Sequence, residues 1–283
     1  MNVATSIPEY RLLRAELPGP VGFVPTMGYL HEGHLSLVRE ARARSTSVVA
    51  SIFVNPSQFA PSEDLAAYPR DLDRDFAFLE AEDVDLVFAP TAEEMYPETF
   101  DTWVEVNDLT KHLEGAARPT HFRGVTTVVA KLFNIVQPQI AVFGQKDAQQ
   151  ALVIRRLIVD LGFDVDLVIA PTVREPDGLA MSSRNAYLST EEREAATVLY
   201  RALQHAETLY ENGERNAQQF RNAVETQLRA EPLARHDYVS VADAEDLTEL
   251  DAVDRKALVS LAVKIGRTRL IDNSVLPPGE ALL

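Results

Sequence analysis

Two histidines and two glycines lie within one short segment, Pro25-Thr26-Met27-Gly28-Tyr29-Leu30-His31-Glu32-Gly33-His34. Glycine lets the backbone come close to a bulky ligand, and the free N–H groups at the start of a helix favour an anion. His31 and His34 are three residues apart, so on a helical first turn their rings face the same way. Two imidazoles placed in this way can donate hydrogen bonds to phosphate oxygens.

The same pair of histidines has two other interpretations. A His-x-x-His pair can bind zinc, but zinc-binding helices usually space their histidines four apart, and no third ligand is evident. The histidines can also act only as structural caps. We prefer phosphate binding because the segment follows a predicted strand, residues 21–26, and opens a predicted helix, residues 33–44. A doubly wound sheet places its ligand at such a turn.

Two later segments carry cations. Phe143-Gly144-Gln145-Lys146-Asp147-Ala148-Gln149-Gln150 also lies at a predicted strand-to-helix turn, where Lys146 offers a point charge to phosphate and Asp147 can cap the helix. Met181-Ser182-Ser183-Arg184-Asn185 brings two hydroxyls and a guanidinium, which suit the clamping of a polyphosphate. An ordinary linker followed by a helix cap is the alternative for this last segment.

Neutral hydrogen-bonding side chains follow another predicted strand. Asn55 and Gln58 suit the recognition of hydroxyl or carboxamide groups, and Arg123 can meet a carboxylate or a phosphate. Each of them can equally have a surface or capping role. The chain has no Gly-x-x-x-x-Gly-Lys-Ser/Thr loop and no Gly-x-Gly-x-x-Gly turn, which disfavours P-loop chemistry and a standard dinucleotide site.

The elements that must position these residues alternate along the first part of the chain. Strands are predicted at residues 21–26, 48–54, 85–89, 140–144 and 165–170, and helices at residues 33–44, 70–82, 126–136 and 147–161. Such alternation is typical of a parallel sheet with helices on both faces. We therefore predict an α/β fold, with a Rossmann-like doubly wound domain at residues 1–172.

The pattern changes near residues 171–185. One long helix is predicted at 189–212, with Ser189 or Thr190 as its N-cap, and a second at 216–230. Strands are predicted at 238–241, 258–265 and 269–271. We predict a smaller α+β domain at residues 173–283, acting as a lid.

Composition limits the partners. The chain has 283 residues and a formal net charge of −16, which repels nucleic acid and anionic lipid. It has no cysteine, which excludes a disulfide framework and a thiolate site and is compatible with a reducing cytoplasm. No apolar run is long enough to span a membrane, and the N-terminal residues lack a signal-peptide pattern. We expect a soluble, cytoplasmic protein.

These motifs resemble a known family. His-x-Gly-His after a first strand, with Met-Ser-Ser-Arg after the last, is similar to the HIGH-motif nucleotidyltransferase superfamily, which includes class I aminoacyl-tRNA synthetases. Within it, residues 25–34, 53–59, 68–70, 121–124, 143–150 and 174–185 resemble the pantothenate synthetase family, the pantoate–β-alanine ligases. The resemblance runs in order over residues 21–190 and is looser in the C-terminal part.

The resemblance implies ATP-dependent condensation of pantoate with β-alanine, through a pantoyl-adenylate, with release of AMP and pyrophosphate. It also implies Mg²⁺ and a homodimer. The implied ATP-binding residues are Met27, Gly28, Tyr29, Leu30, His31, Glu32, Gly33, His34, Gly144, Gln145, Lys146, Asp147, Val173, Met181, Ser182, Ser183 and Arg184. Gln58 would bind pantoate and β-alanine, and Gln150 pantoate.

Catalysis on this hypothesis uses charge stabilisation. Negative charge grows on the departing pyrophosphate, and the side chains predicted to offset it are His31, His34, Lys146, Ser182, Ser183 and Arg184. His34 is the proton donor that the resemblance implies. Asp75 is a predicted metal contact, with a helix-surface acid as the alternative.

Two other functions stay open at this point. Another adenylyl- or cytidylyltransferase of the same fold would make a nucleotide-linked product and release no free AMP. A nucleotide-binding regulatory module would bind without turnover, although it has no need for leaving-group donors such as His34 and Arg184. A tRNA-charging role is disfavoured because the chain is short and acidic.

Overall fold

The computed structural model describes residues 1–60 and 63–283. The chain forms two compact units. One consists of Met1–Gly144 and Gln150–Ala170, and the other of Gln145–Gln149 and Pro171–Leu283. The main division follows Ala170, close to the predicted boundary. The short segment Gln145–Gln149 belongs to the second unit, which the sequence did not predict. The role of the second unit as a lid stays a prediction.

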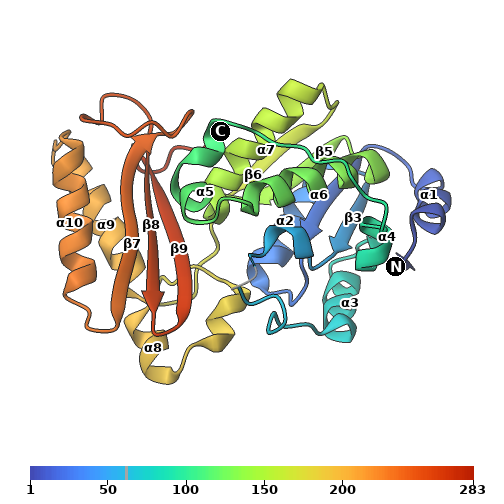
Figure 1. Cartoon of the computed structure of the whole chain (residues 1–283), viewed down its shortest axis with the longest axis horizontal. Helices are drawn as coiled ribbons and strands as arrows, with labels where there is room; N and C mark the ends of the chain where they lie inside the picture. Colours follow the sequence, from blue (N-terminus) through green and yellow to red (C-terminus); the bar gives the residue numbers. More distant parts are fainter. Residues whose placement is uncertain (61–62) are drawn as a thin grey trace. The chain divides into compact units, whose positions relative to one another are not determined.

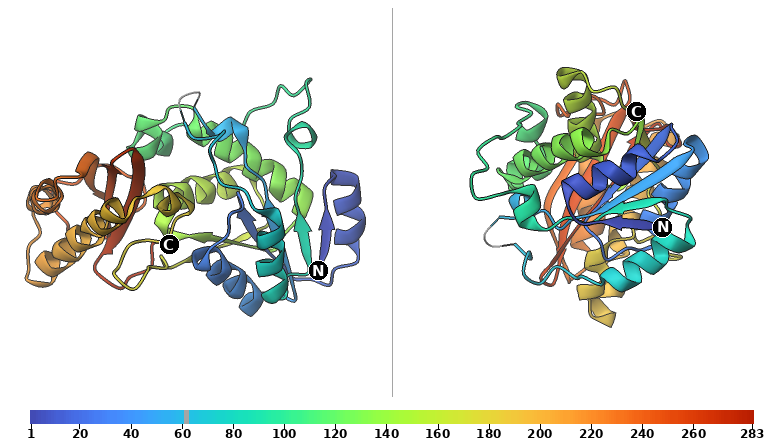
Figure 2. Two further views of the ribbon diagram at one scale, coloured as in Figure 1. Left: turned by 90° about the horizontal axis from the view of Figure 1, so that it is seen from below. Right: turned by 90° about the vertical axis from the view of Figure 1, so that its right-hand side faces the viewer.

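The first unit contains a parallel sheet. Over the described residues it has six strands in the order β1-β4-β3-β2-β5-β6. They are β1 (Asn2–Ala4), β2 (Val21–Thr26), β3 (Ser47–Ile52), β4 (Leu86–Phe88), β5 (Ile140–Gly144) and β6 (Asp166–Ala170). The accompanying helices are α1 (Ile7–Ala15), α2 (Glu32–Arg44), α3 (Leu72–Ala81), α4 (Ala92–Met95), α5 (Leu113–Ala117), α6 (His121–Val136) and α7 (Ala148–Leu161). Figure 2 shows β1 at one edge of this sheet.

Helices cover both faces of this sheet (Figure 1). On one face, Val38 of α2 and Leu79 of α3 pack in a single buried cluster with strand residues such as Val48. On the other face, Tyr10 of α1 lies against Phe88 of β4, with ring centroids 5.0 Å apart. Helices on both faces of a parallel sheet confirm the predicted doubly wound α/β fold.

The direction in which successive strands are added to the sheet changes beside β2. The chain runs from β2 to β3 and β4 on one side, and then returns to place β5 and β6 on the other. Because β2 pairs in parallel with β5, both strands end at the same edge of the sheet, at Thr26 and at Gly144. Ligands of open α/β sheets bind at such a switch point, outside the carboxyl ends of the strands. The histidine segment follows Thr26 directly.

The second unit is a smaller α+β structure. Its antiparallel sheet has the order β7-β8-β9, made by β7 (Ala234–Asp243), β8 (Ala257–Ile265) and β9 (Thr268–Leu276). Its helices are α8 (Thr190–Ala195), α9 (Val198–Glu211) and α10 (Ala217–Arg229). Residues of α9 and α10 share one buried cluster with the inner face of the sheet, among them Leu203, Phe220 and Leu261. The predicted α+β class is confirmed.

The single long helix predicted at residues 189–212 is wrong. Ser189 does cap α8, and its hydroxyl accepts from the Glu192 N–H, but the helix ends at Ala195. A new helix starts after Thr197. At this junction the Thr197 and Leu199 N–H groups donate to carbonyls three residues back, those of Glu194 and Ala196, so the four-residue hydrogen bonds of the α-helix are interrupted.

Within the part of the chain that the structure describes, no helix combines the length and the apolar character that crossing a membrane requires.

Candidate active site

The turn after β2 is fixed by Thr26. Its hydroxyl donates to the Ser51 carbonyl at 2.8 Å and accepts from the Gly28 N–H at 3.1 Å. Gly28 and Tyr29 both have positive φ, +80° and +51°. This region is easy for glycine but unfavourable for a residue such as tyrosine. The turn therefore contains local strain that its surroundings must offset.

Asp75 of α3 lies directly against this turn. Its carboxylate accepts hydrogen bonds from the Tyr29 and Leu30 N–H groups, each at 2.7 Å, and its residue is only 1% exposed. Burial raises the pKa of the Asp75 carboxyl above its ordinary value, and the two amide hydrogen bonds oppose that shift. The alternative of a helix-surface acid is wrong.

The two histidines lie side by side at the start of α2. His31 is the N-cap residue, and its backbone N–H points to Nδ1 of His34 at 3.3 Å. The ring centroids are 4.1 Å apart. Since Nδ1 of His34 accepts, a neutral ring carries its proton on Nε2, which makes Nε2 a hydrogen-bond donor. The three-residue spacing brings the rings together, and phosphate binding by them stays a prediction.

Two other residues of the segment have side chains engaged elsewhere. Leu30 is fully buried in the core. The Glu32 carboxylate pairs with Arg39 at 2.6 Å on the surface of α2. Both residues are in the predicted ATP-binding set, and their part in binding ATP stays a prediction.

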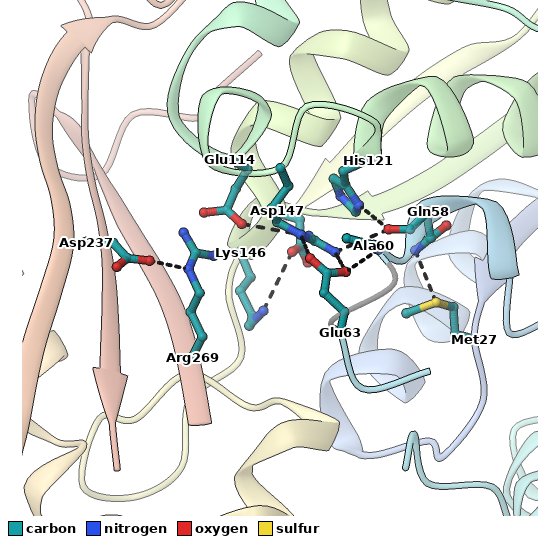
Figure 3. Close-up of polar contacts among 11 residues, drawn as sticks. Met27, Gln58, Ala60, Glu63, Glu114, His121, Lys146, Asp147, Asp237 and Arg269 are labelled. Carbon is teal, nitrogen blue, oxygen red and sulfur yellow. Dashed lines mark hydrogen bonds and ion pairs between the residues drawn. The ribbon is translucent and has the colours of Figure 1, made fainter. Parts of the chain in front are cut away.

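The polar residues after β3 form one connected network. Asn55, 1% exposed, donates to Oε1 of Gln58 at 2.9 Å and to the Gly124 carbonyl at 3.1 Å. Its Oδ1 accepts from the Tyr96 hydroxyl at 2.9 Å. Asn55 is thus committed to the fold and orients Gln58, whose Nε2 lies 3.1 Å from the sulfur of Met27 (Figure 3).

The start of α6 and the residues just before it contact this network. The sequence pointed to only part of these contacts. Nδ1 of His121 lies 2.9 Å from the Gln58 carbonyl, and burial lowers the pKa of His121 to about 4, so its ring is neutral. Arg118 forms a two-pronged ion pair with Glu63 and also donates to the Gln58 carbonyl at 3.3 Å. By contrast, Arg123 is exposed, with its guanidinium over the Trp103 ring, 4.9 Å from the centroid. Its predicted role at the substrate stays a prediction.

Close approach of α6 to Gln58 depends on a glycine. A Cβ built on Gly124 would overlap the carbonyl of Ser57 and the N–H of Gln58. Alanine is normally preferred to glycine inside a helix by about 0.5–1 kcal/mol. Here the backbone contact reverses that preference.

We expect Gly124→Ala to lower the free energy of unfolding by about 1–3 kcal/mol, the usual cost of overpacking. Displacing Gln58 should also weaken the use of whichever substrate Gln58 binds. Denaturant titration measures the first effect. Gly19→Ala is the control, because a Cβ built on Gly19 meets its nearest atom only at 3.8 Å. A stabilised Gly124→Ala protein would contradict the role of the close contact.

In the second unit, β9 holds the segment that carries Lys146. Nδ2 of Asn273 donates to the carbonyls of Gln145 at 3.0 Å and of Lys146 at 2.9 Å. The Lys146 ammonium lies 3.7 Å from the Asp147 carboxylate, an attraction without a hydrogen bond (Figure 3). The predicted helix 147–161 begins one residue later, as α7, after the 3-10 turn Gln145–Asp147. Gln150, in the first turn of α7, belongs to the first unit.

The neighbouring strand residue Asp272 anchors the loop before the hydroxyl segment. Arg174 binds its carboxylate with two hydrogen bonds, at 2.6 and 3.0 Å. Arg174 also bridges to Ala180, and the Met181 N–H donates to the Val173 carbonyl at 3.0 Å. Ser182 accepts from the Arg184 N–H at 3.2 Å and so caps the 3-10 helix Ser183–Tyr187. The structure therefore contains the helix cap that was predicted from the sequence as the alternative role of this segment. Binding of phosphate by this loop stays a prediction.

Comparison with known proteins defines the class. The sequence profile of the family described as Pantoate-beta-alanine ligase matches residues 2–275. The chain is 63% identical over 276 residues to the pantothenate synthetase of a Roseiflexus species, covering 98% of this chain and 99% of that protein.

Solved structures agree with this match. Pantothenate synthetase from Thermus thermophilus has a TM-score of 0.93 at 53% identity, covering 96% of this chain and 98% of that one. A pantoate-beta-alanine ligase from Francisella tularensis, complexed with beta-gamma ATP and beta-alanine, has a TM-score of 0.83 at 33% identity, covering 99% of both chains. The fold and the matches define an enzyme of the class that ligates an acid to an amino acid. More narrowly, the chain belongs to the pantoate–β-alanine ligase family.

Proposed function

We propose that this protein condenses pantoate with β-alanine at the expense of ATP, through a pantoyl-adenylate, and releases AMP and pyrophosphate. Membership of the pantoate–β-alanine ligase family over almost the whole chain is the observation that carries this conclusion. The position of the histidine turn supports it, because the turn follows β2 at the switch point of the sheet, where α/β proteins bind nucleotides.

The first step needs charge stabilisation rather than a base. A carboxylate is already a nucleophile, so pantoate attacks the α-phosphorus and the bond to the pyrophosphate breaks. Negative charge then grows on the departing oxygens. We propose that Nε2–H of His34 donates to these oxygens, since its Nδ1 is occupied by the His31 N–H.

Further donors come from the second unit. Lys146 brings an ammonium, and the segment of Ser182, Ser183 and Arg184 brings hydroxyls and a guanidinium. We propose that the second unit acts as a lid that brings these groups to the triphosphate and keeps water from the adenylate. The amine of β-alanine then attacks the acyl carbon, and AMP leaves.

Pantoate and β-alanine are assigned to the first unit. We propose that Gln58 binds both and Gln150 binds pantoate. Asn55 acts on the substrates through its hydrogen bond to Gln58, since its own amide is committed to the fold.

Gln58→Ala should raise the KM for pantoate about 2- to 10-fold, the effect of one lost hydrogen bond worth roughly 0.5–1.5 kcal/mol. The KM for ATP should change little. Initial rates with one substrate varied at a time measure both constants. Gln218→Ala on the exposed start of α10 is the matched control. An unchanged pantoate response in Gln58→Ala would move Gln58 out of the acid site.

Mg²⁺ is proposed as a companion of ATP. Among residues 1–60 and 63–283, no three His, Asp or Glu side chains gather into a metal-binding group. Mg²⁺ commonly binds through one or two carboxylates together with substrate phosphates, so the nucleotide can supply most of its ligands. When bound, it would offset phosphate charge. Both oxygens of Asp75 already accept amide protons, which argues against the predicted contact from that residue.

A homodimer in the cytoplasm is likewise proposed from the family resemblance. The absence of cysteine from the sequence is compatible with that compartment.

Product analysis tests the proposed function. Incubation with ATP, Mg²⁺, pantoate and β-alanine should yield AMP and pantothenate in equal amounts, and omission of either acid should abolish pantothenate. Accumulation of ADP, or of a nucleotide-linked product without free AMP, would contradict the proposal and favour another transferase of this fold.

A further inference from the structure

The turn that presents the two histidines is held from outside its own segment. Gly28 and Tyr29 are consecutive residues with positive φ. Non-glycine residues keep such a conformation only when surrounding contacts impose it. The contacts that do so here come from α3, a helix more than forty positions later in the sequence.

Asp75 supplies the main contact. Its carboxylate accepts from the Tyr29 N–H and from the Leu30 N–H, and both bonds are 2.7 Å long. Bonds of that length from N–H to a carboxylate are of the charge-assisted kind, about twice as strong as neutral ones. The residue after Leu30 is His31, so the two bonds fix the chain immediately before the first imidazole.

Arg74, the preceding residue of α3, binds the next peptide group of the same turn. Its Nη2 donates to the Leu30 carbonyl at 2.6 Å, and its guanidinium lies over the Tyr29 ring, 4.6 Å from the centroid. Arg74 and Asp75 therefore bind the N–H and the C=O of Leu30 from a single helix. Because both backbone groups of Leu30 are bound, the turn has little freedom to move, and the positions of the two imidazoles that follow it are restricted.

Space around the turn is equally restricted. A Cβ built on Gly28 would come within 2.9 Å of Oδ2 of Asp75 and of a methyl group of Ile52. The carboxylate therefore touches the turn along three consecutive residues. A metal ion bound by the same oxygens would compete with the two amide protons.

We propose that Asp75 is a positioning residue for catalysis: it locks the turn at Gly28–Leu30 so that His31 and His34 meet the triphosphate in the productive geometry. Arg74 assists it through the Leu30 carbonyl. This inference rests on the proposed function for its effect on rate, but the contact itself can be tested without any turnover.

Asp75→Asn is the sharpest variant, because it keeps the shape and removes one acceptor. One of the two N–H groups then faces an NH₂ group. We expect kcat to fall about 10- to 100-fold, because misplacing a catalytic group by about 1 Å can cost on the order of 10²-fold. The KM for ATP should change much less, since the lost interaction matters most in the transition state.

Asp73→Asn is the matched control, an exposed acid on the same helix with the same change of charge. Hydrogen exchange at the Tyr29 and Leu30 amides, followed by NMR in the free enzyme, reports on the contact independently of activity. We expect faster exchange there in Asp75→Asn and no change in Asp73→Asn. If Asp75→Asn fails to fold, Arg74→Gln is tested in the same way, with a smaller loss of kcat expected.

Three results would overturn the proposal. The first is wild-type exchange at both amides in Asp75→Asn. The second is a kcat within about twofold of that of Asp73→Asn. The third is recovery of activity on raising Mg²⁺ with the amides unchanged, because that would make Asp75 a metal ligand. If the exchange rates change as expected but no variant, nor the wild type, makes pantothenate, the proposed function fails while the contact stands.

Discussion

His34→Ala is expected to lower kcat by about 10²- to 10³-fold, the usual loss when one donor to a developing oxyanion is removed. The reason lies in the tautomer that one hydrogen bond favours. The His31 N–H points to Nδ1 of His34, so a neutral ring carries its proton on Nε2, and we propose that this proton is donated to the departing pyrophosphate. Release of AMP at saturating pantoate, β-alanine and ATP measures the effect.

His34→Gln is the matched variant for this prediction. Glutamine can place an amide N–H near the position of the imidazole Nε2–H, so it should lose less activity than alanine does. Thermal unfolding of both variants shows whether the start of α2 is intact. Nearly full turnover by His34→Ala would remove that histidine from the catalytic set.

Lys146→Ala is the second large effect, with a similar expected loss of about 10²- to 10³-fold in kcat. Asn273 donates to the carbonyls of Gln145 and Lys146 and so holds this segment from β9. The Lys146 ammonium lies 3.7 Å from the Asp147 carboxylate, an attraction without a hydrogen bond, and we propose that its N–H groups donate to phosphate. Rates are measured as for His34→Ala.

Lys111→Ala is the control for the loss of a positive charge, because Lys111 is an exposed partner of Asp108 in the first unit. Its activity should stay close to that of the wild type. Lys146→Arg should recover only part of the rate, since a planar guanidinium does not reproduce a compact ammonium. If Lys146→Ala and Lys111→Ala were equally active, the ammonium of Lys146 would have no part in the chemistry.

Much of the first unit could be predicted from local pattern. Apolar, β-branched runs such as the one at β5 predicted buried parallel strands, and the strand Ile140–Gly144 was located correctly. The short edge strand β1, Asn2–Ala4, was missed because three residues provide too little periodicity to recognise. Its place in the sheet comes from pairing with β4, far along the chain.

The end of β9 shows why tertiary contacts defeat a local prediction. The sequence pattern predicted a strand only at residues 269–271, whereas the strand runs through Thr268–Leu276. Asp272 and Asn273 interrupt the apolar pattern, yet both are buried. Arg174 pairs with the Asp272 carboxylate, and Nδ2 of Asn273 donates to two backbone carbonyls. Those partners are about 100 residues or more away in sequence, so no window around β9 could reveal them.

Some candidate site residues could be found from motif spacing, and others depend on distant contacts. Motif spacing identified His31 and His34 as a pair, and the structure places their rings together. It did not identify Arg118, and it left Asp75 between two roles, a metal contact and a surface acid. The Asp75 carboxylate binds amides of a turn that is distant in the sequence. Only the fold brings the two together, so the sequence of α3 by itself could not reveal this role.

We expect bond breaking between the first and second phosphorus atoms of ATP, before the amine takes part. This order of events is tested by exchange of labelled pyrophosphate into ATP, run with pantoate and Mg²⁺ but without β-alanine. We expect exchange that requires pantoate and that is strongly reduced in His34→Ala. No exchange in the wild-type enzyme, under conditions in which it makes pantothenate once β-alanine is added, would contradict it.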